Sequence, residues 1–191
     1  MSRARDDPAS PGDGAIMAVP PGIGTDQAAI LYSGDTAVLD GHRATLRTLG
    51  AIVWVGADPG AAALRDLALL GVMWAALGGF YQAVALVGAE GQRATDFAPI
   101  AADWLRTVAG FLATDAAEID ARDYTDAVST LDVNAAGLEL LRRTSERRGV
   151  PFGVAATVQR LVDARIADGH GTDSLASLAE LFRSSSRADA A

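Results

Sequence analysis

The chain of 191 residues contains no cysteine and no lysine, since all 16 of its basic residues are arginine. Without thiols it can form no disulfide framework, cysteine nucleophile or zinc knuckle. Without lysine it can form no Schiff base with a carbonyl substrate. His42 and His170 are the two histidines, and they lie too far apart in the sequence to show metal-ligand spacing. The sequence therefore predicts no metal site.

Positive charge is also scarce. The net charge is -8 at pH 7, with a pI near 4.6, and no basic patch is interleaved with aromatic residues. Long-range attraction to nucleic acid or to anionic lipid is therefore not expected. Residues 1–13 are polar and contain no apolar core of a secretory signal. They are interpreted as a disordered leader, and a cytoplasmic location is the default.

One long run lacks charge altogether. Leu67 to Ala89 contains 23 uncharged residues, enough to span a bilayer. The run is rich in alanine and glycine, and each flank carries an acid and an arginine, so there is no positive-inside asymmetry. A helix that is apolar all round can equally form the core of a helical bundle. We favour the bundle and predict no membrane partner, with a membrane-associated helix as the alternative.

Residues 14–57 have the pattern of an incomplete sheet domain. Apolar strands are expected at Ala15–Val19, Ala29–Tyr32 and Ala51–Val55, the last of them buried because it is continuously apolar. A helix is expected over Thr36–Leu49, with Asp35 as its N-cap and Gly50 at its end. This order is too short for a doubly wound domain and matches only its last part.

From residue 58 onward every signal is helical. A long helix is followed by shorter ones, the first capped by Thr95 or Asp96, and Gly169-His170-Gly171 is expected to be a helix-ending turn. The expected fold class is mainly α: a remnant of a Rossmann-type sheet with about three strands and one helix, then a long interdomain helix and a helical bundle. The predicted parts are a leader (1–13), a partial dinucleotide-binding domain (14–57), a helical domain (58–184) and a tail (185–191).

Common catalytic motifs are missing. Gly22-Ile23-Gly24 is followed by Thr25, Asp26 and Gln27, so the dinucleotide fingerprint G-x-G-x-x-G fails, and no phosphate-binding P-loop is present. No cofactor-binding residue can be named from the sequence.

Asp66 is the one candidate for proton chemistry. It lies in the second turn of the long helix among apolar residues, where burial would raise its pKa toward that of a general acid. The alternative is a carboxylate favoured by the helix dipole, paired with Arg65 or another arginine. Trp74, eight residues on, projects from roughly the same face and could line a substrate pocket or belong to the core. Trp104 and Tyr124 carry the same ambiguity.

Several segments in order resemble one enzyme family. They are G-A-I-M-A-V-P-P-G-I-G-T (14–25), I-L-Y-S-G (30–34), G-A-D-P-G-A-A-A-L-R-D-L-A-L-L-G-V-M-W (56–74), A-L-V-G-A-E-G (85–91) and D-G-H-G-T-D-S (168–174). Together they resemble NADPH-dependent imine reductases and reductive aminases, relatives of β-hydroxyacid dehydrogenases.

The resemblance implies a site and partners. Asp66 matches the presumed proton donor or substrate-amine anchor, Trp74 matches a pocket position, and Trp104 falls in the pocket region. The resemblance also implies intertwined homodimers that reduce small imines with NADPH, each active site combining one subunit's cofactor domain with its partner's bundle. The family's Gly-rich nucleotide-binding half has no counterpart here, so we expect the chain to be inactive alone or to need a separate nucleotide-binding subunit. The alternative is a non-enzymatic helical module for dimerisation or for binding a small ligand.

Overall fold

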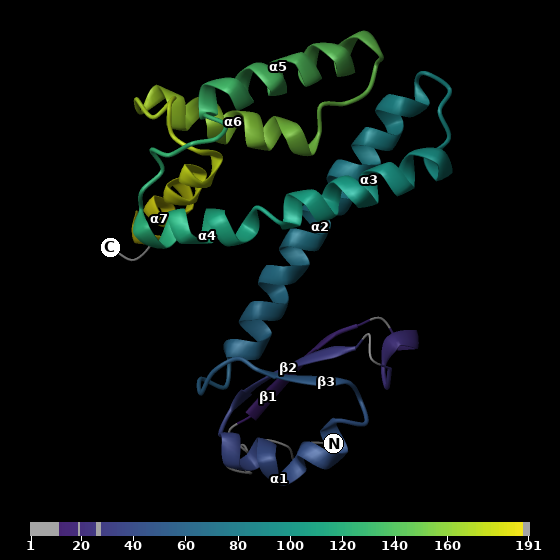
Figure 1. The fold of residues 1–191 in the computed structure, drawn as a ribbon, viewed down its shortest axis with the longest axis vertical. Coiled ribbons are helices and arrows are strands. Elements are labelled where there is room, and N and C mark those ends of the chain that lie inside the picture. Colours follow the sequence, from purple (N-terminus) through teal and green to yellow (C-terminus); the bar gives the residue numbers. More distant parts are fainter. Residues whose placement is uncertain (1–11, 19, 26–27, 189–191) are drawn as a thin grey trace, which may run out of the picture. The chain divides into compact units, whose positions relative to one another are not determined.

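The computed structural model describes residues 12–18, 20–25 and 28–188, with side chains described up to Arg183. The fold is mostly helical with one small sheet, which confirms the predicted mainly α class (Figure 1). The chain divides into two compact units, one ending at Trp74 and the other beginning at Ala75. The division falls inside the long helix.

The first unit holds three strands in the order β1-β2-β3. β1 (Gly12–Met17) pairs antiparallel with β2 (Ala29–Gly34), and β2 pairs parallel with β3 (Ala51–Trp54). The first expected strand begins earlier than predicted, at Gly12, and the short 3₁₀ helix η1 (Pro20–Gly22) follows it. Val19, the expected last residue of that strand, lies outside the described residues. The two strands of the parallel pair are joined by the helix α1 (Thr36–Leu46), as a parallel crossover requires.

The expectation that the third strand is buried was wrong. Val53 is 41% exposed and Trp54 is 47% exposed. β3 is an edge strand that is hydrogen-bonded to β2 alone among the described strands. A continuous apolar run is typical of a strand covered on both faces, but the core of this unit instead gathers around Ala15, Leu31 and Ala62.

The helix α1 begins as predicted and ends early. The Asp35 carboxylate accepts a hydrogen bond from the backbone N–H of Ala37 at 2.7 Å, which is the predicted N-cap. The helix ends at Leu46 rather than Leu49, and the chain turns toward β3 at Gly50. A side chain at Gly50 would place its Cβ 2.6 Å from the backbone oxygen of Ala28, so this close approach requires glycine.

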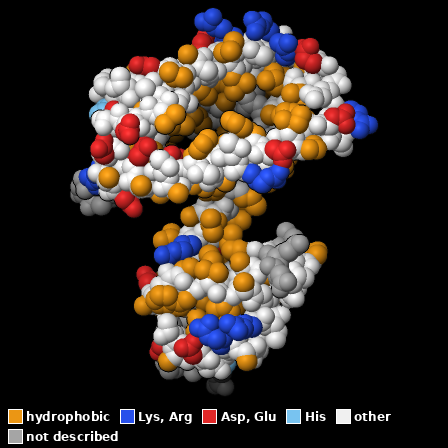
Figure 2. All heavy atoms as spheres, in the orientation of Figure 1, with side chains coloured by type: hydrophobic (Ala, Val, Ile, Leu, Met, Phe, Trp, Pro, Cys, Tyr) orange, Lys and Arg blue, Asp and Glu red, His pale blue; other side chains and the backbone are white. Residues whose placement is uncertain are grey.

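The long helix α2 (Ala61–Gly88) is apolar, but few of its side chains are buried by the rest of the chain. Ala62 is its one fully buried residue among the described residues. By length and composition it is the one helix in the described part of the chain that could cross a membrane. Hydrophobic side chains gather along it in Figure 2, and the large exposed ones are Leu64, Leu67, Leu69, Val72, Met73, Trp74, Leu77 and Tyr81.

The second unit continues with α3 (Ala94–Ala109), α4 (Leu112–Ala121), α5 (Leu131–Arg147), α6 (Val154–Ala167), the 3₁₀ helix η2 (Leu175–Leu178) and α7 (Ala179–Ala188). The prediction that Thr95 or Asp96 caps α3 was wrong: the N-cap is Arg93, and Asp96 lies in the first turn, paired with the Arg93 side chain. The helix-ending turn at Gly169 is present, because Gly169 adopts a φ of 90° after α6.

Candidate functional site

The first turn of α2 is fixed to the sheet by a buried hydroxyl. Ser33, at the end of β2, donates to the backbone oxygen of Pro59 at 2.7 Å and accepts from the N–H of Ala62 at 3.1 Å. The Asp58 carboxylate accepts from the N–H of Gly60 at 2.9 Å and closes the turn before the helix. These contacts hold the first turn of α2, and so the turn that follows it, in a defined place.

Asp66 lies in that second turn and is half-buried. Its carboxylate has no hydrogen bond or ion pair among the described residues. The suggested pairing with Arg65 is not formed, since the Arg65 guanidinium donates to the backbone oxygen of Ala61 at 3.3 Å. Asp66 is therefore the acid of this helix whose oxygens are open to a ligand. Its expected apolar surroundings are partly wrong, because Leu67 is 63% exposed.

Trp74 stands on the same helix and does not belong to the core. Its side chain is 62% exposed. Eight residues separate it from Asp66, which corresponds to about 12 Å along a helix axis. The two side chains are therefore about two turns apart along α2.

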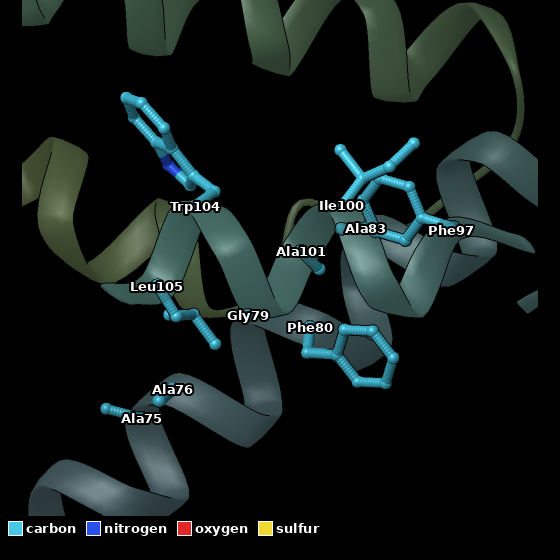
Figure 3. A pocket seen from close by; sticks show the side chains of 10 residues that line it. All are labelled: Ala75, Ala76, Gly79, Phe80, Ala83, Phe97, Ile100, Ala101, Trp104 and Leu105. Atoms are coloured by element: carbon cyan, nitrogen blue, oxygen red, sulfur yellow. The ribbon is translucent and has the colours of Figure 1, made fainter. Parts of the chain in front are cut away.

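Trp104 lies in the second unit and lines an apolar groove between α2 and α3 (Figure 3). The groove has a volume of about 390 Å³ and is lined by Ala75, Ala76, Gly79, Phe80, Ala83, Phe97, Ile100, Ala101, Trp104 and Leu105. The rings of Phe80 and Phe97 are stacked at 6.3 Å between centroids. No charged side chain lines the groove, so it fits an apolar occupant rather than an ionic one.

Tyr124 does not line this groove. It is 5% exposed, and its hydroxyl donates to the Glu180 carboxylate at 2.7 Å. Burial, followed by the hydrogen bond to Glu180, raises the pKa of Tyr124 above its usual 10.0. Of the two readings left open for Tyr124, the structure supports the core residue.

The N-terminus of α1 does not fit a diphosphate. The parallel crossover offers one helix N-terminus after a strand, where a diphosphate would be held by backbone N–H groups. In this chain the Asp35 carboxylate already binds that helix N-terminus through Ala37. A negative side chain there repels phosphate. No cluster of His, Asp and Glu that could hold a metal was found within the described ranges either.

Sequence reasoning did not find Ser33, which fixes the helix that carries Asp66. The sequence signal for Ser33 was present but not specific, because a serine at the end of a strand is typical of a turn. Its partners Pro59 and Ala62 are more than 25 positions away in the sequence. Asp58 was detectable, because Asp58-Pro59-Gly60 is a turn sequence.

Residues 58–184 match the family model for the C-terminal domain of NADPH-dependent reductive aminase-like proteins. The chain is 37% identical to the NADPH-dependent reductive aminase of Aspergillus oryzae over 175 residues, which are 89% of this chain and 59% of that protein. A reductive aminase from Aspergillus terreus, solved with NADPH4, cyclohexanone and allyl amine, matches with a TM-score of 0.83 and 37% identity over 90% of this chain and 60% of that one.

The imine reductase of Streptomyces aurantiacus matches with the same TM-score of 0.83 and with 34% identity, over 90% of this chain and 60% of that one. The chain thus spans about three fifths of the length of the relatives it matches. The predicted resemblance is confirmed. By the match of its helical part to the family model, the chain belongs to the NADPH-dependent reductive aminase-like family, whose C-terminal domain it contains.

Proposed function

We propose that this chain is the C-terminal part of an oxidoreductase that reduces a C=N bond, and that it is not active alone. The observation that carries the proposal is Asp66, an unpaired, half-buried carboxylate on the interdomain helix of a family of imine-reducing enzymes. Chemistry on an imine needs a group that protonates or orients nitrogen, and a carboxylic acid can do both.

Asp66 would donate a proton to the imine nitrogen or hold the protonated nitrogen by charge. Trp74 would contribute an apolar wall against the substituents of the substrate, and Trp104 would bind substrate as part of the apolar groove of the second unit. Both indoles are 62% exposed in the chain by itself, so each is available to a ligand or to another protein surface. The substrate class that fits one carboxylate with aromatic walls is a small imine or amine with apolar substituents.

The reductive aminase of Aspergillus oryzae that this chain resembles is NADPH-dependent. Since Asp35 occupies the helix N-terminus that could have held a diphosphate, the dinucleotide must be bound by other residues. We propose that a nucleotide-binding part carrying a G-x-G-x-x-G turn supplies that site, either in the same polypeptide or as a separate subunit.

The protein would act as a homodimer in the cytoplasm, without nucleic acid or membrane as a partner. Support for the dimer comes from α2, an apolar helix with one fully buried residue among those described. An exposed surface of this kind is rarely left open to water in a soluble protein. A second copy of the chain can cover this surface of α2 without any other protein.

The test of this function is reconstitution. The chain is mixed with, or fused behind, a nucleotide-binding half from an imine reductase, and the oxidation of NADPH is followed with a cyclic imine. We expect turnover in the reconstituted enzyme and none with the 191-residue chain alone. Turnover by the chain alone would overturn the claim of inactivity, and a folded but inactive reconstituted enzyme would overturn the proposed reaction.

A second function is supported by the groove between α2 and α3. Its volume of about 390 Å³ and its apolar lining would suit a small-ligand or dimerisation module that needs no cofactor. Saturable binding of an apolar fluorescent probe that is lost in Trp104→Ala, without any reductase activity after reconstitution, would favour this alternative.

A further inference from the structure

The C-terminal segment 170–183 ties together elements that are distant in sequence. The backbone oxygens of Gly171 and Asp173 accept from the N–H groups of Asp132 and Leu131, both at 2.9 Å, and so complete the first turn of α5. The N–H of Ser174 donates to the backbone oxygen of Tyr124 at 2.9 Å. Segment 170–183 therefore holds the start of α5 and the linker that precedes it.

Side chains of the same segment bind α4 and the linker. Tyr124 donates to Glu180 at 2.7 Å, and Arg183 binds Glu180 at 2.6 Å and the backbone oxygen of Ile119 at 3.2 Å. The Ser174 hydroxyl donates to the Glu118 carboxylate. Each of these contacts except that to Ile119 ends on a carboxylate.

A third carboxylate, Asp173, binds the segment to α6. Asp173 accepts from Arg165 of α6 at 3.4 Å and lies 2.9 Å from Nδ1 of His170. The Arg165 and Asp173 side chains are only 12% and 13% exposed. A charged pair this deeply buried depends on both partners, since either one left alone is strongly destabilising.

No apolar side chain in the outer part of the segment, 175–183, is fully buried. Leu175 is 42% exposed and Phe182 is 64% exposed, whereas Leu131 of α5 and Val162 of α6 are fully buried. The stability of η2 and α7 therefore rests on the polar contacts more than that of α5 and α6 does.

We propose that segment 170–183 is an acid-sensitive clasp: protonating Glu180 breaks its contacts with Tyr124 and Arg183 and releases α7 while α5 and α6 stay folded. The charged groups that face Glu180 are Arg122 after α4 and Arg183 of α7, while Asp115 of α4 faces Glu118, and Arg165 of α6 and His170 in the turn face Asp173. Asp132 of α5 lies against Gly171, where an added Cβ would come within 2.6 Å of its carboxylate.

The direction of the effect follows from Glu180. The hydrogen bond from Tyr124, followed by those from Arg183, holds the pKa of Glu180 below its usual 4.5. A carboxyl group with a lowered pKa in the folded state contributes stability above its unfolded pKa, and this stability is lost as the pH falls through the folded value. The clasp is therefore closed at neutral pH and opens in acid.

Hydrogen exchange measured by mass spectrometry on the whole chain tests this proposal, with rates corrected for the intrinsic effect of pH. We expect amides in 175–183 to lose protection on acidification before those in 155–165. At pH 7, Glu180→Gln should raise exchange in 175–183 by about tenfold or more, because a hydrogen bond to a charged group is lost. Tyr124→Phe should also raise the exchange of amides in 175–183, because its hydroxyl is the donor of the hydrogen bond to Glu180.

The matched control is Glu139→Gln on α5. Glu139 also binds two arginines, Arg142 and Arg143, but lies outside the clasp. Its substitution should leave exchange in 175–183 unchanged. Simultaneous loss of protection in 155–165 and 175–183, or an equal effect of the control, would overturn the proposal.

Discussion

Ser33 and Asp66 are 33 positions apart in the sequence, but both bear on the proposed reaction. Ser33 fixes the first turn of α2, and Asp66 stands one turn further along with open carboxylate oxygens. The position of the acid is thus decided by the sheet and not by the helix alone. A mutation at either residue should act on the proposed reaction, but by different routes.

Asp66→Asn in the reconstituted enzyme should lower kcat by about 10²–10⁴-fold, because the amide cannot donate a carboxyl proton or carry a charge. Binding of NADPH should be largely unchanged. Steady-state kinetics with titration of NADPH checks both. Asp40→Asn, an exposed acid on α1 that is paired with Arg43, is the control and should leave kcat unchanged. Full activity of Asp66→Asn would remove this residue from the mechanism.

Ser33→Ala should lower the free energy of unfolding by about 1–3 kcal/mol, because the buried N–H of Ala62 and the backbone oxygen of Pro59 both lose their partner. The midpoint of urea unfolding measures the change. Thr48→Ala, which removes an exposed local hydrogen bond to Thr45, should shift the midpoint far less. Equal shifts in the two variants would contradict the anchoring role of Ser33.

Among the helices and strands, α2 shows the largest difference between its apolar composition and the burial of its side chains. A helix that is apolar all round is expected to be buried, yet eight of its large side chains are exposed, among them Leu67 and Trp74. Self-association of the chain would bury this surface. Insertion into a bilayer would also do so, but the flanks of the helix carry no positive-inside signal.

We therefore expect light scattering to give the mass of a dimer in buffer without detergent. Leu67→Asp should shift the mass toward the monomer, because a charge in an apolar interface is not solvated. Leu140→Asp on α5 is the matched control, since Leu67 and Leu140 are both 63% exposed. A monomeric parent chain, or solubility only in detergent, would contradict the dimer.

For the molecule as a whole, the question is whether the 191 residues can bind NADPH. The parallel crossover has an aspartate where a diphosphate would bind, and the sequence has no G-x-G-x-x-G turn. Calorimetry at physiological salt should therefore detect no binding of NADPH to the chain alone, and binding should appear after reconstitution. Saturable binding to the chain alone would mean that another site holds the dinucleotide.

Much of the local structure could be predicted because it depends on neighbouring residues. Asp35 caps α1 through an N–H two positions away, and Gly169 ends α6 through its own backbone freedom. The mainly α class followed from the long helical stretch beyond residue 58. These features require no knowledge of which surfaces meet.

The tertiary structure decided what depends on contacts between distant segments. The apolar composition of β3 predicted burial, but an edge strand has one hydrogen-bonded neighbour and open faces. Ser33 acquired its role from residues 26 and 29 positions away, and Tyr124 from Glu180, 56 positions away. The sequence alone determined the N-cap of α1 and the turn that ends α6, because those follow from local hydrogen bonds and residue type. Only the packing of the chain decided which apolar residues are covered, because burial depends on what the rest of the chain places beside them.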